Sequence, residues 1–166
     1  STNRLNGTSL ETGGGYLDFN NASRTSGTGT IKWDGQNSTG LRGLDVTDGG
    51  TNDAVFFGVI FADADIAMAF SLTDTQGRVS TYNTLLVEEL SDPEEVFFRF
   101  SDFSGSADLT QINAISLTLI GTRPAVDLTL DRIYFGATVA PVPVPAAAPL
   151  LLAAIGGLAL AGRRRK

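Results

Sequence analysis

Carboxylates are the main side chains that this chain offers for chemistry, because it contains neither histidine nor cysteine. The absence of histidine excludes Ser-His-Asp triads, His-ligated zinc and the usual general base at neutral pH, and the absence of cysteine excludes thiol catalysis. Two carboxylates are still sufficient for glycoside hydrolysis. The densest acidic group consists of Glu88, Glu89, Asp92, Glu94 and Glu95. It surrounds Pro93, as in a solvated corner, so we predict that the protein is not an enzyme.

A second acidic group lies in a glycine-containing loop between two predicted strands. Its oxygen-bearing side chains are Asp45, Asp48, Asn52 and Asp53. Ca²⁺ binds roughly six to eight hard oxygen donors, which closely spaced carboxylates in such a loop supply. Asp131, in the last predicted strand, is a candidate distant ligand, and we predict a structural calcium site from this set. The alternative is that the Asp, Asn and Gly residues simply form a turn.

Aromatic and hydrogen-bonding side chains together favour carbohydrate binding, because ring faces stack on sugars and polar neighbours hold the hydroxyl groups. Trp33 ends a predicted strand and is followed closely by Asp34 and Asn37, and these three residues form the predicted glycan-binding site. Further aromatic surface is offered by Tyr16, Tyr82 and Tyr134. The alternative for Trp33 is burial in the core of the domain.

The elements that position these side chains are predicted to be strands, because apolar residues alternate with small or polar ones along most of the chain. Ile66, Met68, Phe70 and Leu72 share one face, with Ala67, Ala69 and Ser71 on the other. The same alternation predicts strands around residues 96–101, 115–119 and 126–131. Additional strands are predicted at residues 16–19, 29–33, 41–46, 55–61 and 78–87.

About nine short strands without crossover helices predict one all-β domain over residues 1–138. Its simplest architecture is an antiparallel β-sandwich with jelly-roll connections. Residues 1–15 are rich in Ser, Thr, Asn and Gly, and we expect them to form loops or a mobile arm of this domain.

The last predicted strand changes phase along its length. Leu130 belongs to one apolar series, whereas Ile133 and Phe135 belong to another that is shifted by one residue. Such a shift predicts a β-bulge near Asp131 and Arg132, where one residue has no partner in the neighbouring strand.

The end of the chain differs in composition from the domain. In residues 139–145, valine alternates with proline from residue 141 onward, and this pattern predicts an extended linker. The apolar residues 146–162 would form a helix of roughly 25 Å, near the shortest that crosses a bilayer. Four cations follow, and they should stay in the cytoplasm and hold the preceding chain outside: Arg163, Arg164, Arg165 and Lys166. We therefore predict a transmembrane-like helix that anchors the protein transiently in the inner membrane.

A proline-containing motif, an apolar span and a basic cluster, in this order, resemble the C-terminal sorting signal of the PEP-CTERM class. The motif residues Val142, Pro143, Val144, Pro145 and Ala146 are most similar to its VPLPA variant. The resemblance implies recognition by an exosortase, a membrane protease-transpeptidase, with processing near this motif and release or transfer to the cell surface. The Glu of the Pro-Glu-Pro form is absent. Members also begin with a signal peptide, whereas Ser1–Leu10 has neither a basic start nor an apolar core, so we expect a cleaved chain or a fragment.

A second, more diffuse resemblance concerns the domain. The Asp-rich loop at residues 45–53, together with the strand at residues 125–131, is similar to the jelly-roll domains common in carbohydrate-binding modules. That resemblance implies a structural Ca²⁺ near the first and last strands and a carbohydrate ligand.

Charge separates the remaining function classes. The chain carries 12 basic and 18 acidic residues, and without the four terminal cations the balance is 8 against 18, or −10. Nucleic acid is therefore excluded as a partner, because phosphate binding requires clustered cations. We predict a non-enzymatic, exported protein of the cell surface or extracellular matrix that associates with exopolysaccharide. The alternatives are a self-assembling subunit of a coat or filament and, more weakly, a carbohydrate-active enzyme.

Overall fold

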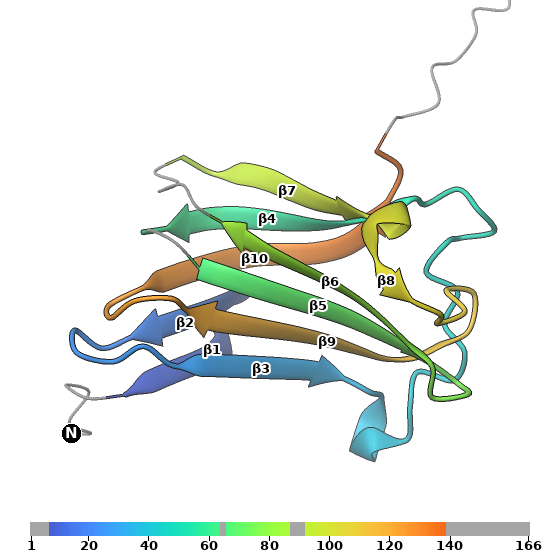
Figure 1. Ribbon diagram of the computed structural model, residues 1–166, viewed down its shortest axis with the longest axis horizontal. Coiled ribbons are helices and arrows are strands. Elements are labelled where there is room, and N and C mark those ends of the chain that lie inside the picture. The colour runs from blue at the N-terminus through green and yellow to red at the C-terminus, as the bar shows by residue number, and fades with distance from the viewer. Residues whose placement is uncertain (1–6, 64–65, 87–91, 139–166) are drawn as a thin grey trace, which may run out of the picture.

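A computed structural model of the protein describes residues 7–63, 66–86 and 92–138, and within them ten strands form two five-stranded antiparallel sheets (Figure 1). The first sheet has the order β1-β2-β10-β4-β7 and the second the order β3-β9-β5-β6-β8. The strands are β1 (Thr8–Gly13), β2 (Tyr16–Asn21), β3 (Thr28–Trp33), β4 (Ala54–Ala62), β5 (Ile66–Asp74), β6 (Val79–Leu86), β7 (Glu94–Arg99), β8 (Ser104–Gly105), β9 (Ile112–Gly121) and β10 (Asp127–Gly136). Two short 3-10 turns, η1 (Gln36–Ser38) and η2 (Phe100–Asp102), complete the described structure.

The strand pairing is nested. The innermost pair is β5 with β6. In sequence it lies between the partners β4 and β7, which lie between β3 and β9, and these lie between β2 and β10. Members of each pair lie in the same sheet, and successive pairs alternate between the two sheets. This is the connectivity of a jelly roll, and the predicted all-β antiparallel sandwich is confirmed.

The core lies between the two sheets and follows the predicted alternation. Ile66, Met68, Phe70 and Leu72 of β5 are each at most 1% exposed, whereas the residues between them are half-buried on the outer face. Phe70 meets Phe57 of the opposite sheet edge to face, with ring centroids 5.4 Å apart. Because the chain has no disulfide, this apolar contact between the sheets is the main source of its stability.

Two predicted segments differ from the structure. Residues 8–13 were expected in a loop or mobile arm, but they form β1, which pairs with β2 along its whole length. Backbone hydrogen bonds to a neighbouring strand thus override a polar composition. Residues 41–46 were expected to form a strand, but only Leu44 makes an isolated bridge, to Ile112, because Arg42 and Gly43 adopt positive φ values of 59° and 76°.

The predicted β-bulge in β10 is confirmed. Leu130 pairs with Val59 and Arg132 with Gly58, which leaves Asp131 without a partner in β4. A second irregularity lies between Thr129 and Leu130. The bulge restores the correct faces on both sides, since Leu130 and Ile133 both pack toward the core.

Several predictions fall on residues that the structure does not describe. They are the linker and sorting motif at 139–145, the apolar helix at 146–162, the cations at 163–166, and Glu88 and Glu89 of the acidic cluster. Within the described ranges, no helix is long and apolar enough to cross a membrane.

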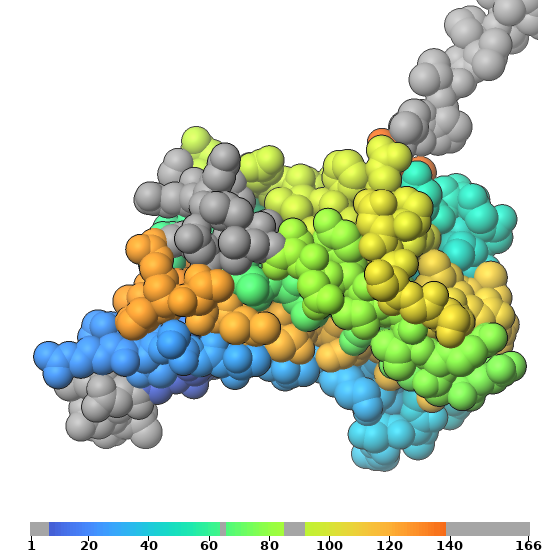
Figure 2. All heavy atoms as spheres, viewed as in Figure 1, coloured from blue at the N-terminus to red at the C-terminus, as the bar shows by residue number. Residues whose placement is uncertain are grey.

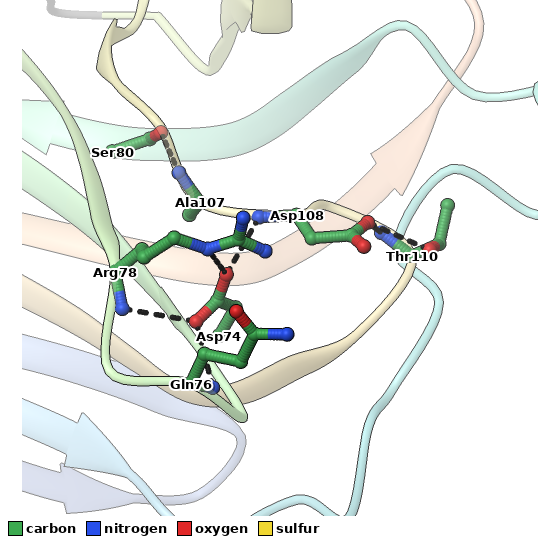
Figure 3. A network of polar contacts seen from close by, with 7 residues as sticks. All are labelled: Asp74, Gln76, Arg78, Ser80, Ala107, Asp108 and Thr110. Carbon is green, nitrogen blue, oxygen red and sulfur yellow. Dashed lines mark hydrogen bonds and ion pairs between the residues drawn. The ribbon is translucent and has the colours of Figure 1, made fainter.

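One buried carboxylate ties three segments of the second sheet together (Figure 3). Asp74, at the end of β5, is 1% exposed. Its Oδ1 accepts hydrogen bonds from the backbone N–H groups of Gln76 and Arg78, both at 2.9 Å. Its Oδ2 accepts one from the Arg78 Nε at 2.6 Å and one from the Asp108 N–H at 2.9 Å. The β5–β6 hairpin is thereby attached to the loop that precedes β9.

These hydrogen bonds decide the ionisation of Asp74. Burial alone would raise the pKa of its carboxyl, but the bonds from Asp108, Arg78 and Gln76 outweigh burial and lower the pKa from 3.8 to about 2. Because the pKa is lower in the folded protein than in the unfolded chain, the ionised carboxylate stabilises the fold at pH values above about 4. This stabilisation is lost as the pH falls from about 4 to about 2.

We expect Asp74→Asn to lower the melting temperature at pH 7 by roughly 10 °C, because its amide group would meet N–H donors that the carboxylate now satisfies. The difference from the wild type should shrink as the pH falls toward 2, where Asp74 itself becomes protonated. Thermal melts followed by circular dichroism at several pH values measure both effects. The exposed Asp102→Asn serves as control and should leave the melt unchanged. Equal melting of Asp74→Asn and wild type at pH 7 would contradict the role assigned to this carboxylate.

Candidate functional site: an aromatic row and an edge groove

Three aromatic rings lie side by side on the outer face of the first sheet. Tyr134 of β10 is the register partner of Phe56 of β4, which is in turn the partner of Phe97 of β7. The Phe56 ring stacks on Tyr134, with centroids 5.0 Å apart and an interplanar angle of 11°, and lies 5.5 Å from Phe97. Tyr134 is 39% and Phe97 44% exposed, whereas Phe56 between them is 7% exposed. We call these three residues the aromatic row.

Charged side chains border the aromatic row on one side. In the adjoining cross-strand row, Arg132, Gly58 and Glu95 are register partners. Gly58 has no side chain, so the Arg132 guanidinium extends across β4 and meets Glu95 Oε2 at 3.3 Å. The Tyr134 hydroxyl donates to the same oxygen at 2.8 Å. This hydrogen bond, followed by burial and the Glu95 charge, raises the pKa of Tyr134, which keeps the hydroxyl a neutral donor.

On the other side of the aromatic row, most of the neighbouring side chains are small. There the register partners are Gly136, Ala54 and Arg99, so two of the three positions have almost no side chain. The Arg99 guanidinium lies 5.8 Å from the centre of the Phe97 ring, and Arg132 lies at the same distance from Tyr134. The two outer rings, Tyr134 and Phe97, are thus exposed, and each has a guanidinium nearby, whereas Phe56 between them is buried.

The outer face of the second sheet is different. Figure 2 views the molecule from this side, and the strands from β3 (blue) to β6 (green) form one continuous surface. Its side chains are mostly small and polar, as in the pair formed by Thr30 and Thr118, whose hydroxyl oxygens are 3.0 Å apart. The two faces therefore differ, and the in-register aromatic row lies on the first sheet.

A groove opens at the edge of the sandwich. β2 begins at Tyr16 and pairs with β10 only as far as Leu130, so the part of β10 beyond the bulge has no β2 neighbour. The resulting cavity has a volume of about 420 Å³ and lies between this part of β10, the end of β3 and the loop that follows η1. We call it the edge groove. It is bordered by Thr12, Gly15, Tyr16, Leu17, Ile31, Trp33, Leu41, Leu44, Phe70, Ile115, Leu130, Asp131, Arg132, Ile133 and Phe135.

The three residues of the predicted glycan site have different surroundings. Trp33 borders the edge groove and is partly buried against the core, so its place in the core is confirmed in part, while its role in glycan binding stays a prediction. Asp34 forms an ion pair with Lys32 at 3.1 Å. Asn37 lies in η1, is exposed and has a positive φ of 55°. Neither Asp34 nor Asn37 borders the groove.

The tyrosines fall into three environments. Tyr16 borders the edge groove, Tyr134 belongs to the aromatic row, and Tyr82 packs on Phe98 with ring centroids 4.5 Å apart. Sequence reasoning missed Phe56 and Phe97 as members of a surface. The signal that could have revealed them is the pair of adjacent phenylalanines in each strand, since neighbours in a strand face opposite sides.

The predicted calcium ligands already accept hydrogen bonds in their own loops. Asp45 accepts bonds from the Thr47 hydroxyl at 2.6 Å and from the Thr47 N–H at 2.9 Å, and with a bond from Gly49 they lower its pKa. Asp53 accepts bonds from the hydroxyl and N–H of Thr138, both at 2.7 Å, which lower its pKa in the same way. These contacts are those of turn-forming residues.

The remaining members of the calcium set lie in the same turn or at the β10 bulge. Asn52 donates to the carbonyl of Val46 at 3.1 Å, and Asp48 has a positive φ of 47° in the turn. Asp131 lies at the β10 bulge. Among the described residues, no three acidic, histidine or cysteine side chains are gathered in a way that could hold a metal ion. Calcium binding stays a prediction from the sequence. If Ca²⁺ is bound, a chelator should lower the melting temperature, and an unchanged melting temperature would contradict the prediction.

Asp131 is tightly packed against β4. Its Oδ1 is buried and has no hydrogen-bond partner in the described part of the chain. A β carbon added at Gly58 would collide with this oxygen and come within 3.0 Å of the Arg132 Cγ. Gly58 therefore provides the space that both the bulge and the Arg132–Glu95 ion pair require.

Comparisons with known proteins bear on the fold. No family model and no curated protein matches the chain. Among solved structures, an agarase and an exo-beta-agarase each match 82% of this chain with a TM-score of 0.56, at 14% and 16% identity. The chain spans only 22% and 23% of the length of those two proteins. The likeness therefore shows a shared fold.

A smaller neighbour matches along most of its own length. It is a family 11 carbohydrate-binding module from Clostridium thermocellum in complex with a beta-1,3-1,4-mixed-linked tetrasaccharide, and the match covers 92% of that module and 76% of this chain. The identity is 14% and the TM-score is 0.42.

We expect Gly58→Ala to destabilise the protein by about 1–3 kcal/mol, because the added methyl group must displace the Asp131 carboxylate from its packed position. Denaturant unfolding measures the change. Gly13→Ala in β1 is the matched control, since a β carbon at that position meets nothing within 4 Å. If both variants unfolded like the wild type, the bulge would not depend on the space at Gly58.

Proposed function

We propose that the domain is a non-enzymatic polysaccharide-binding module that acts outside the cell, and that the aromatic row is its binding surface. The observation that carries this proposal is the alignment of Tyr134, Phe56 and Phe97 across three neighbouring strands on an open sheet face. Their register makes the surface elongated and shallow, which suits an extended chain better than a single sugar.

The chemistry of the row supports a sugar ligand. Pyranose rings present apolar C–H faces that pack on aromatic rings, and their hydroxyl groups need hydrogen-bond partners at the rim. Arg132 and Glu95 offer donors and acceptors along one side of the row, and Arg99 offers donors at one end. Arg132 and Glu95 already neutralise one another, so the rim on that side favours hydroxyl groups over a strongly charged polymer.

The carboxylates near these surfaces support binding without catalysis. Glu95, beside the row, is held by Arg132 and by the Tyr134 hydroxyl. The pKa of Asp127 is raised by burial and by the neighbouring Asp63, as in some catalytic acids, but Asp127 does not border the edge groove. Its Oδ1 accepts a hydrogen bond from the Asn21 N–H at 3.3 Å, which is a structural contact.

Export and surface sorting form the second part of the proposal and rest on the sequence. The motif at residues 142–146, the apolar residues 146–162 and the cations at 163–166 are those expected of an exosortase substrate. In this proposal, the tail holds the protein in the inner membrane until it is processed, and the acidic domain then reaches the surface or the extracellular matrix. A polysaccharide there is the partner that the aromatic row would bind.

We expect Phe97→Ala to weaken polysaccharide binding about tenfold, because it removes the most exposed ring of the row. Affinity electrophoresis and isothermal titration against a panel of polysaccharides measure this effect. The panel includes agarose, since two of the structural neighbours are agarases. Ile120→Ala, which removes a side chain of similar exposure from β9, should bind like the wild type. The absence of binding across the panel, or equal loss in both variants, would refute the row as a glycan site.

We expect the intact mass of the natively exported protein to correspond to a chain that ends near residues 142–146. Replacing both Pro143 and Pro145 with Ala should leave full-length chain, with Lys166 present, in the inner membrane. Mass spectrometry of the membrane and extracellular fractions distinguishes the two forms. If the double variant were released with the same mass as the wild type, the sorting motif would have no role.

A further inference from the structure

We propose that strand β7 is an interaction edge at which a second copy of this chain adds its own β7 in antiparallel orientation. The first sheets of the two copies would then join into one continuous sheet across a two-fold axis. This inference goes beyond polysaccharide binding, since it names a protein partner, and it does not depend on what the aromatic row binds. It rests on a free strand edge and on the complementary residues along that edge.

β7 is an edge strand, because it pairs with β4 alone and ends the strand order of its sheet (Figure 1). The other described edges are different. β1 lies against β3 of the second sheet, where a β carbon added at Gly29 would come within 3.2 Å of Leu10. β8 has only two residues. A free edge of six residues presents N–H and C=O groups with which another strand can pair.

The backbone groups that face the free edge belong to every second residue of β7. Directly after the strand, the Phe100 N–H donates to the Asp53 carbonyl at 2.8 Å, so residue 100 bonds on the β4 side. Hydrogen bonds between antiparallel strands recur at every second residue. The even-numbered residues of β7 therefore bond toward β4, whereas Glu95, Phe97 and Arg99 present their N–H and C=O groups at the free edge.

One register satisfies all of these outward-facing groups. A two-fold axis at Phe97 places this residue opposite its own copy, and it places Glu95 opposite Arg99 of the second copy. A shift of the second strand by two residues in one direction would bring Pro93, which has no N–H, opposite Arg99. The same shift in the other direction would bring Glu95 opposite Ser101, which lies in η2 and outside the strand.

The same register pairs complementary side chains, because directly opposite residues lie on the same face of a sheet. Glu95 and Arg99 carry opposite charges, so two ion pairs would form across the axis. The Glu95 side chain is 37% exposed beside Arg132, and a carboxylate can accept bonds from more than one cation. The Phe97 ring, which is 44% exposed, would meet its copy and leave water. The two aromatic rows would then continue into one another.

Charge variants of the full chain test this register, and sedimentation equilibrium without polysaccharide measures the association. Arg99→Glu places like charges opposite one another at both pairs, and so does Glu95→Arg. Each variant alone should associate at least about tenfold more weakly than the wild type, because two attractive pairs become repulsive. An equimolar mixture of the two variants should associate again, since every Arg then faces a Glu. Lys32→Glu, a charge reversal on β3, is the control and should associate like the wild type.

Hydrogen exchange tests the backbone contact directly. The amide protons of Glu95, Phe97 and Arg99 should become protected as the concentration of the wild type rises. Those of Val96 and Phe98 should be protected at every concentration, since they bond within the sheet. A contact made through side chains alone would protect only the second set.

Several outcomes would overturn the inference. They are a wild type that stays monomeric up to about 1 mM, association of Arg99→Glu alone that equals the wild type, and folded variants whose mixture stays monomeric. If a variant does not fold, hydrogen exchange of the wild type decides, and unprotected amide protons at residues 95, 97 and 99 would refute the contact. Association through residues 146–162 would be equal in all variants. A monomer that binds polysaccharide would leave the proposed function intact, so either proposal can fail without the other.

Discussion

The shift of register at Asp131 is the constraint on which both candidate surfaces depend. Up to Leu130, β10 pairs with β2 on one side and β4 on the other. Beyond the extra residue, Ile133 and Phe135 face the core and Tyr134 faces outward beside Phe56. Without the bulge, the alternation of side chains would put the aromatic ring of Tyr134 into the core and Ile133 on the surface. The same irregularity coincides with the end of β2, which opens the edge groove.

The bulge is possible because β4 has a glycine opposite it. Gly58 leaves room for the Asp131 carboxylate and lets Arg132 reach Glu95 on β7. Asp131 and Asp74 differ in how their carboxylate oxygens are satisfied. Both are aspartates in or beside the sandwich, yet Asp74 accepts four hydrogen bonds and stabilises a hairpin, whereas one buried oxygen of Asp131 has no donor in the described structure.

The aromatic row and the edge groove differ in shape and in chemistry. The aromatic row lies on a sheet face, exposes Tyr134 and Phe97 on either side of the buried Phe56, and is bordered by charged side chains. The edge groove is concave and has mainly apolar walls. Arg132 belongs to the borders of both, since it lies over Tyr134 and lines the groove. Both surfaces are built largely on strands, so the core that holds the two sheets together also fixes the positions of their side chains.

The sequence by itself determined the all-β class, the faces of β5, β9 and β10, and the bulge near Asp131. These follow from the alternation of residues along single strands, a local property that the chain carries at each position. Tertiary structure decided the rest. It converted the polar residues 8–13 into a strand, kept residues 41–46 as a loop, and placed Phe56, Phe97 and Tyr134 side by side although they are far apart in the chain. It also placed Trp33 and Tyr16 on the border of one groove that Asn37 does not reach. Pairing between distant strands sets these contacts, and it depends on register and on the packing of both sheets, neither of which a single strand's pattern contains.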